Sequence, residues 1–165
     1  QKNYLFYLNC IPEILKLEKE LYFLFIGQGE DKKRFLEISN KLNISDKIFV
    51  IDHTNNVHYF MKKAKALVLS SLWEDPGFVL VEAAISRTLV LTTSAKPGPN
   101  ELVKNNFNGL VYRENDYIDF KRQFDRIFSS EDFNILKLNN LKSVKKFTLL
   151  SHYLQIKKII LEDKP

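Results

Sequence analysis

The sequence predicts a doubly wound α/β domain with a Rossmann-like parallel sheet. Several short apolar runs have the length and composition of strands, and they are hydrophobic almost throughout, which is typical of strands covered on both faces. Segments with a helical period separate them. Such alternation favours a parallel sheet with ligand sites at the carboxyl ends of its strands. The predicted strands are LYFLFI (21–26), KIFVI (47–51), ALVLS (66–70), TLVLTT (88–93) and GLVY (109–112).

The first predicted helix covers residues 3–19, and no strand precedes it. A doubly wound sheet usually begins with a strand that becomes central, so we expect the first strand to lie before Gln1, in a longer protein. Pro12 lies inside this helix. Because proline lacks a backbone donor, Pro12 should kink or divide the helix.

The remaining predicted helices follow the strands in order. Phe35, Ile38 and Leu42 share one face of the helix after the first strand. The chain shows no internal repeat, low-complexity segment or domain boundary, so residues 1–165 are expected to form a single domain with a helical C-terminal segment. The helical segments are 30–42, 57–66, 78–86 and much of 114–162.

The composition is that of a soluble globular protein. Hydrophobic residues make up 45% of the chain and charged residues 27%. The longest apolar runs are too short to span a bilayer, and no signal-peptide pattern is visible. The single cysteine, Cys10, excludes an internal disulfide and suits a reducing compartment. These features favour the cytoplasm.

The net charge of +5 leaves two interpretations open. Lysine, asparagine and isoleucine are abundant throughout, which favours a general compositional bias. Alternatively, the basic C-terminal stretch contacts a partner or the inner face of the membrane as a peripheral protein. No recognition helix or base-stacking motif accompanies the charge, so nucleic acid is not expected as a partner. The basic residues of this stretch are Lys137, Lys142, Lys145, Lys146, Lys157 and Lys158.

Several familiar catalytic and binding motifs are absent, because the sequence lacks their required residues or spacing. Gly27-Gln28-Gly29 follows a predicted strand, but Lys32 stands where a dinucleotide-binding fingerprint needs its third glycine, so a tight turn is the better interpretation. Ser70 and Ser71 end a strand without the flanking glycines of a nucleophile elbow. The three histidines lack metal-ligand spacing and no Asp-x-Asp pair exists, so neither a metal nor a cofactor is expected.

The stretch SLWEDPGFVLVEAA (71–84) carries the strongest site signal. Glu74 and Glu82 flank a Pro-Gly step, after which a helix begins near Gly77. The free N–H groups of a first helical turn form a site for phosphate oxygens. Glu82 lies among apolar residues, where an unpaired carboxylate is costly. It either pairs with a cation such as Arg87 or binds a ligand with hydroxyl groups, whereas Glu74 either faces the crevice or is a solvated loop residue.

These residues resemble the E-x7-E motif of retaining glycosyltransferases of the family-4 type, which have the two-domain GT-B fold. The surroundings match in order and spacing over roughly residues 20–115, from EDPGFVLVEAA and TLVLTT to GPNELV (98–103) and NGLVY (108–112). The resemblance implies that this chain is the C-terminal, donor-binding half. An N-terminal acceptor-binding domain would then be its missing partner.

The resemblance also implies a role for each matched residue. Glu74 would contact hydroxyls of the transferred sugar, and Glu82 would accept hydrogen bonds from the ribose. Lys2 resembles the lysine that neutralises the departing diphosphate. The donor would be a UDP-, GDP- or ADP-linked sugar, held without a metal. Backbone groups of the turn would hold its phosphates or its sugar; they belong to Pro76, Gly77, Phe78 and Val79.

Two functions follow, because the sequence departs from the family's pattern. The family's arginine, a few residues ahead of the lysine, would lie before Gln1. The leading hypothesis is a donor-binding domain of a hexosyltransferase-like enzyme of surface-polysaccharide or lipopolysaccharide synthesis, inactive on its own. The alternative is a truncated, inactive fragment that acts only as a binding or interaction module. A receiver-like or other nucleotide-binding α/β protein is disfavoured, since a receiver needs an acidic cluster at its strand ends.

Overall fold

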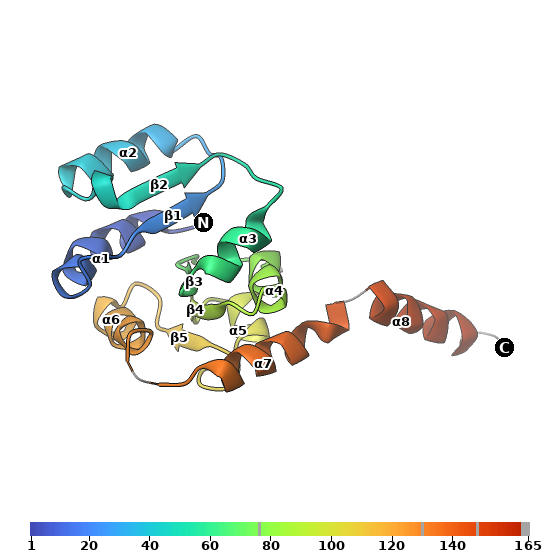
Figure 1. Cartoon of the computed structure of the whole chain (residues 1–165). Helices are drawn as coiled ribbons and strands as arrows, with labels where there is room; N and C mark the ends of the chain where they lie inside the picture. The colour runs from blue at the N-terminus through green and yellow to red at the C-terminus, as the bar shows by residue number, and fades with distance from the viewer. Residues whose placement is uncertain (76, 130, 148, 163–165) are drawn as a thin grey trace.

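The computed structural model describes residues 1–75, 77–129, 131–147 and 149–162, and shows an α/β domain with parallel strands (Figure 1). β1 pairs with β2, and β3, β4 and β5 form a second sheet in that order. Every pairing between these strands is parallel. The predicted strands are confirmed, with small shifts at their ends. Their bounds are β1 Phe23–Ile26, β2 Ile48–Ile51, β3 Ala66–Leu69, β4 Leu89–Thr93 and β5 Leu110–Tyr112.

Helices connect the strands and continue beyond the last of them. Gly27-Gln28-Gly29 lies in the connection from β1 to the next helix, as the turn interpretation predicted. The predicted helical C-terminal segment is confirmed over its described residues, and Figure 1 shows α8 extending away from the sheets. The helices are α1 Tyr4–Leu17, α2 Lys32–Lys41, η1 Ser45–Lys47, α3 Val57–Lys63, α4 Phe78–Ile85, α5 Pro99–Leu102, α6 Tyr117–Arg126, α7 Asn134–Ser143, η2 Val144–Phe147 and α8 Leu149–Glu162.

The sequence predicted that Pro12 kinks or divides α1, and the structure excludes the division. The helix runs from Tyr4 to Leu17 with Pro12 inside it. Leu8 and Ile11, before the proline, and Ile14, after it, are all buried. Burial of such side chains contributes about 1.5–3 kcal/mol each, which offsets the roughly 3 kcal/mol cost of a proline in a helix interior.

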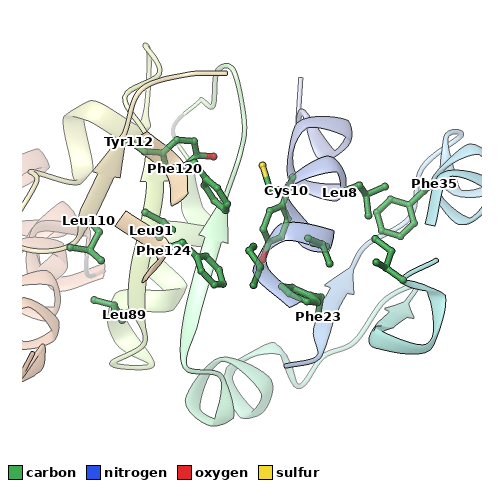
Figure 2. Close-up of a cluster of buried hydrophobic side chains, with 14 of the residues drawn as sticks. Leu8, Cys10, Phe23, Phe35, Leu89, Leu91, Leu110, Tyr112, Phe120 and Phe124 are labelled. Atoms are coloured by element: carbon green, nitrogen blue, oxygen red, sulfur yellow. The ribbon is translucent and has the colours of Figure 1, made fainter. Parts of the chain in front are cut away.

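The larger hydrophobic cluster covers one face of the sheets. It joins α1, α2 and α6 to β1, β4 and β5, and includes Leu8, Phe35, Leu91 and Phe120. Figure 2 shows α1 between the second sheet on one side and Phe23 and Phe35 on the other, with Leu8 directed toward Phe35. This helix therefore joins the two sheets into one core.

The second hydrophobic cluster covers the opposite face of β3 and β4. Met61 of α3 and Leu80 of α4 pack there with Val90. Since Leu89 and Leu91 belong to the larger cluster, the alternation along β4 places the two clusters on opposite faces. Helices on both faces of parallel strands define a doubly wound fold, which confirms the predicted fold class.

β1 and β3 each have an edge that pairs with no other described strand. The start of the chain lies at the carboxyl end of β3, where the Leu72 N–H donates to the Gln1 carbonyl over 2.9 Å. The Ser70 hydroxyl donates to the Lys2 carbonyl over 2.9 Å. These contacts bring Lys2 to the edge of the sheet where ligands bind in such folds. The strand expected before Gln1 stays a prediction.

Candidate functional site

Two loops at the carboxyl edge of the second sheet are joined to each other. One follows β3 and carries Glu74, and the other follows β4. The Thr93 hydroxyl donates to the Ser71 carbonyl over 2.7 Å, and the Glu74 N–H donates to the Pro97 carbonyl over 3.2 Å. The loop that carries Glu74 is therefore held by the neighbouring strand and its loop.

Glu74 is a buried carboxylate with partners inside the chain. Its side chain accepts hydrogen bonds from Lys2 Nζ at both oxygens, over 2.7 and 2.9 Å, and from Ser71 Oγ over 2.5 Å. The residue is 5% exposed, so the alternative of a solvated loop residue was wrong. The Lys2 side chain is 61% exposed. Because an ammonium has three N–H donors, Lys2 keeps the capacity to bind a further anion.

Glu82 lies within α4 in a different state. It is half-buried, and its neighbours Val81 and Ala83 are buried. Its carboxylate makes no hydrogen bond or ion pair with the described residues, so the alternative of an ion pair with Arg87 is not realised in the structure. Arg87 instead adopts a φ of 55° just beyond the helix, and its N–H donates to the Ala84 carbonyl. An acid left without a partner in an apolar helix is a ligand-binding candidate.

The N-terminus of α4 lies between these two acids in the sequence and presents backbone N–H donors. Gly77 caps the helix with a φ of 82° and contributes no side-chain cap. The Leu80 N–H bonds to the Gly77 carbonyl, whereas the N–H groups of Phe78 and Val79 have no partner among the described residues. Such donors, with the helix dipole, favour an anion. Pro76, also predicted to belong to this turn, lies outside the described residues.

A hollow of about 430 Å³ borders Phe78, the first residue of α4. Lys146 and Phe147 of η2 and His152 of α8 complete its lining. Phe78 is 60% exposed, and Lys146 Nζ lies 5.0 Å from the centre of the Phe147 ring. The sequence places Lys146 in a basic stretch, and nothing local shows that η2 returns to α4. The lysine adds positive charge to this side of the site.

The described residues contain no group of three or more His, Cys, Asp or Glu side chains arranged to hold a metal ion. Cys10 is buried, and burial raises the pKa of its thiol to about 12, so it is neutral and a poor nucleophile at neutral pH. Among the helices of the described chain, none is both long and apolar enough to cross a membrane.

The chain belongs to the family Glycosyl transferases group 1, whose model matches residues 1–146. It is 27% identical to the UDP-Gal:alpha-D-GlcNAc-diphosphoundecaprenol alpha-1,3-galactosyltransferase of Escherichia coli, over 98% of this chain and 43% of that protein. It is 24% identical to the poly(ribitol-phosphate) alpha-N-acetylglucosaminyltransferase of Staphylococcus aureus, over 64% of this chain and 22% of that protein. The chain thus spans less than half the length of these relatives.

Solved structures share the fold. The pneumococcal O-GlcNAc transferase GtfA, in complex with UDP and GlcNAc, superposes with a TM-score of 0.85 at 17% identity, over 98% of this chain and 33% of that one. Anabaena Alr3699/HepE, in complex with UDP and glucose, gives 0.85 at 15% identity, over 98% of this chain and 45% of that one. The predicted GT-B glycosyltransferase domain is confirmed. The roles predicted for individual residues stay predictions.

Proposed function

We propose that this chain binds the nucleotide sugar of a retaining, hexosyltransferase-like glycosyltransferase that works in surface-polysaccharide or lipopolysaccharide synthesis. The observation that carries the proposal is the N-terminus of α4, where N–H donors and, about one turn further on, the half-buried carboxylate of Glu82 have no partner among the residues that the structure describes. A nucleoside diphosphate presents phosphate oxygens for the donors and ribose hydroxyls for the acid. UDP in the GtfA and HepE complexes supports this choice of ligand.

Each side chain then has a task in donor binding. The N–H groups of Gly77, Phe78 and Val79 hold the phosphates, aided by the helix dipole. Lys2 stabilises the negative charge that develops on the diphosphate when its bond to the sugar breaks. Glu74 accepts hydrogen bonds from hydroxyls of the sugar while it remains bonded to Lys2. Glu82 accepts hydrogen bonds from the ribose hydroxyls. Lys2 and the helix N-terminus supply the positive charge, so the proposal requires no metal.

Transfer itself belongs, in this proposal, to a longer protein that also binds the acceptor. The relatives are more than twice as long as the part that this chain matches. We place the protein at the cytoplasmic face of the membrane, because relatives act on diphosphoundecaprenol acceptors by name and α8 exposes apolar side chains beside Lys157. The exposed apolar side chains of α8 are Tyr153, Leu154, Ile156, Ile159, Ile160 and Leu161.

Calorimetric titration of the chain with UDP, GDP, ADP and their sugar derivatives tests the proposal. At least one nucleotide should bind, and EDTA should leave its affinity unchanged. A folded sample that binds none of them overturns the proposal. If the longer protein binds a donor without transferring its sugar, the chain is the binding module of the alternative hypothesis. If it transfers the sugar, NMR of the product should show the anomeric configuration of the donor.

A further inference from the structure

Gly98, at the start of α5, lies directly against the backbone of Glu74. Its φ of 100° falls in a region that L side chains rarely adopt. A Cβ at this position would stand 2.3 Å from the Glu74 carbonyl oxygen, and 3.0 Å from both the Glu74 carbonyl carbon and its Cβ. Backbone atoms cannot turn aside as a flexible side chain can. Any side chain at this position must therefore separate the Gly98 loop from the segment that carries Glu74.

Other glycines of the chain show how specific this approach is. At Gly77 an added Cβ would meet Glu74 Cβ at 3.3 Å, a tight contact that small shifts relieve. At Gly29 it would meet nothing within 4 Å. At Gly109 it would meet Val103 Cγ1, a side-chain atom far from Glu74 in the sequence, at 2.7 Å. Gly98 differs from these glycines because its contact under 3.0 Å is with the Glu74 backbone.

The loop after β4 fixes the Glu74 segment at several points. The Pro97 carbonyl accepts the Glu74 N–H, and Thr93 bonds the backbone of Ser71. Ser71 in turn donates from its hydroxyl to the Glu74 carboxylate over 2.5 Å. Gly98 allows this loop to come close enough for these contacts, and the Glu74 carboxylate then lies against Lys2.

We propose that Gly98 is a positioning residue for Glu74 and thereby determines affinity for the sugar part of the donor. The inference rests on the proposed function and narrows one part of it. Because Glu82, the first turn of α4 and the largely exposed Lys2 ammonium hold the nucleoside diphosphate, a displaced Glu74 should cost affinity only for ligands that carry a sugar. Gly98 itself touches no ligand in this scheme.

The test compares Gly98→Ala with Gly29→Ala in calorimetric titrations. The ligands are whichever of UDP and GDP binds the chain, and the matching nucleotide hexose. Gly98→Ala should weaken hexose-nucleotide binding roughly tenfold to a hundredfold, the range for losing a hydrogen bond to a charged group. It should leave free UDP or GDP binding unchanged, and Gly29→Ala should change neither. Equal losses for both ligands, or no loss for either, overturn the inference.

Ser71→Ala is a milder substitution that should also loosen Glu74. It removes only the hydroxyl that bonds Glu74, so the selective loss for the hexose nucleotide should appear without a backbone clash. If Gly98→Ala does not fold, this variant decides the question alone: a loss shared by both ligands, or no loss, contradicts the positioning of Glu74.

A ligand-free measurement separates this inference from the proposed function. In the wild-type chain, Lys2→Met should shift the ¹³C NMR signal of the Glu74 carboxylate, because the ion pair is lost. In the Gly98→Ala background the same change should have no effect. If the Lys2→Met shift persists there, Gly98 does not position Glu74. If Lys2→Met shifts the Glu74 signal in the wild-type background only, but the chain binds no nucleotide, the proposed function is contradicted and the positioning of Glu74 by Gly98 is not.

Discussion

Glu74 and Glu82 belong to one short segment, yet the structure treats them in opposite ways. Glu74 is 5% exposed and accepts hydrogen bonds from Lys2 and Ser71. Glu82 is half-buried and has no side-chain partner in the described part of the chain. An acid with internal partners is a fixed element of the fold, whereas an acid without them sacrifices stability and gains a partner only from a ligand. The two acids of the motif are therefore not interchangeable.

The largest expected effect is on nucleotide binding. Glu82→Ala should weaken binding of free UDP or GDP about tenfold to a hundredfold, since hydrogen bonds to a charged group contribute about 1.5–3 kcal/mol. Glu74→Ala should have little effect on the same ligands, because it faces the sugar. Calorimetry on both variants measures the difference. Equal losses for the free nucleotide would show that the two acids share one role.

Removing Glu74 should cost stability. Glu74→Ala leaves the Ser71 hydroxyl buried without its acceptor, and we expect a loss of about 1–2 kcal/mol in the free energy of unfolding. The ion pair itself adds little, because the Lys2 side chain is 61% exposed and stays solvated. Urea unfolding measures the loss.

The double variant Glu74→Ala/Ser71→Ala is the control for this explanation. Removing both partners of a buried hydrogen bond can be nearly neutral, so the second substitution should restore part of the lost stability. A double variant less stable than Glu74→Ala would mean that Ser71 stabilises the loop by other contacts.

The strands and the start of α4 could be predicted because their signals are local. Continuous apolar runs indicated buried parallel strands, and the Pro-Gly step before Phe78 indicated the start of a helix; phosphate binding at that helix start stays a prediction. The continuity of α1 past Pro12 could not be predicted, because the packing that holds the helix together comes from distant strands.

The partners of Glu74 could not be predicted from the sequence. Lys2 and Glu74 are 72 positions apart, and the pair forms because the Leu72 N–H binds the Gln1 carbonyl. Gly98 appeared only as part of a family pattern, GPNELV. Its close approach to Glu74 depends on how two loops from different strands meet, which no local pattern encodes.

Asp119, like Glu74, is an acid with partners inside the chain. It tests whether such an acid affects stability without affecting ligand binding. Burial by itself would raise the pKa of Asp119, but the Arg113 N–H, at 2.9 Å, and the Arg122 guanidinium lower that pKa below its usual value. The stabilisation is thus present above the unfolded-state pKa of about 3.9 and is lost as the pH falls through the lower folded-state pKa.

Asp119→Asn should therefore lower the stability of the chain at neutral pH, and the gap from wild type should narrow as the pH falls below about 4. Urea unfolding across this range measures the gap. Because Asp119 lies in the first turn of α6 and bonds residues from Arg113 to Arg122, none of them in the proposed site, nucleotide affinity should not change. A gap that stays constant into acid would mean that Asp119 contributes by packing and not by charge.

The smallest expected effect has the opposite sign and tests the comparison most directly. Glu82→Ala should raise the free energy of unfolding by about 0.5 kcal/mol, because alanine is the better helix former and the substitution removes a half-buried acid that lacks a described partner. Thermal unfolding of Glu82→Ala and Glu82→Gln measures it; the glutamine keeps the shape and loses the charge. If Glu82→Ala destabilises the chain as Glu74→Ala should, Glu82 stabilises the fold, and its half-buried carboxylate is not reserved for a ligand.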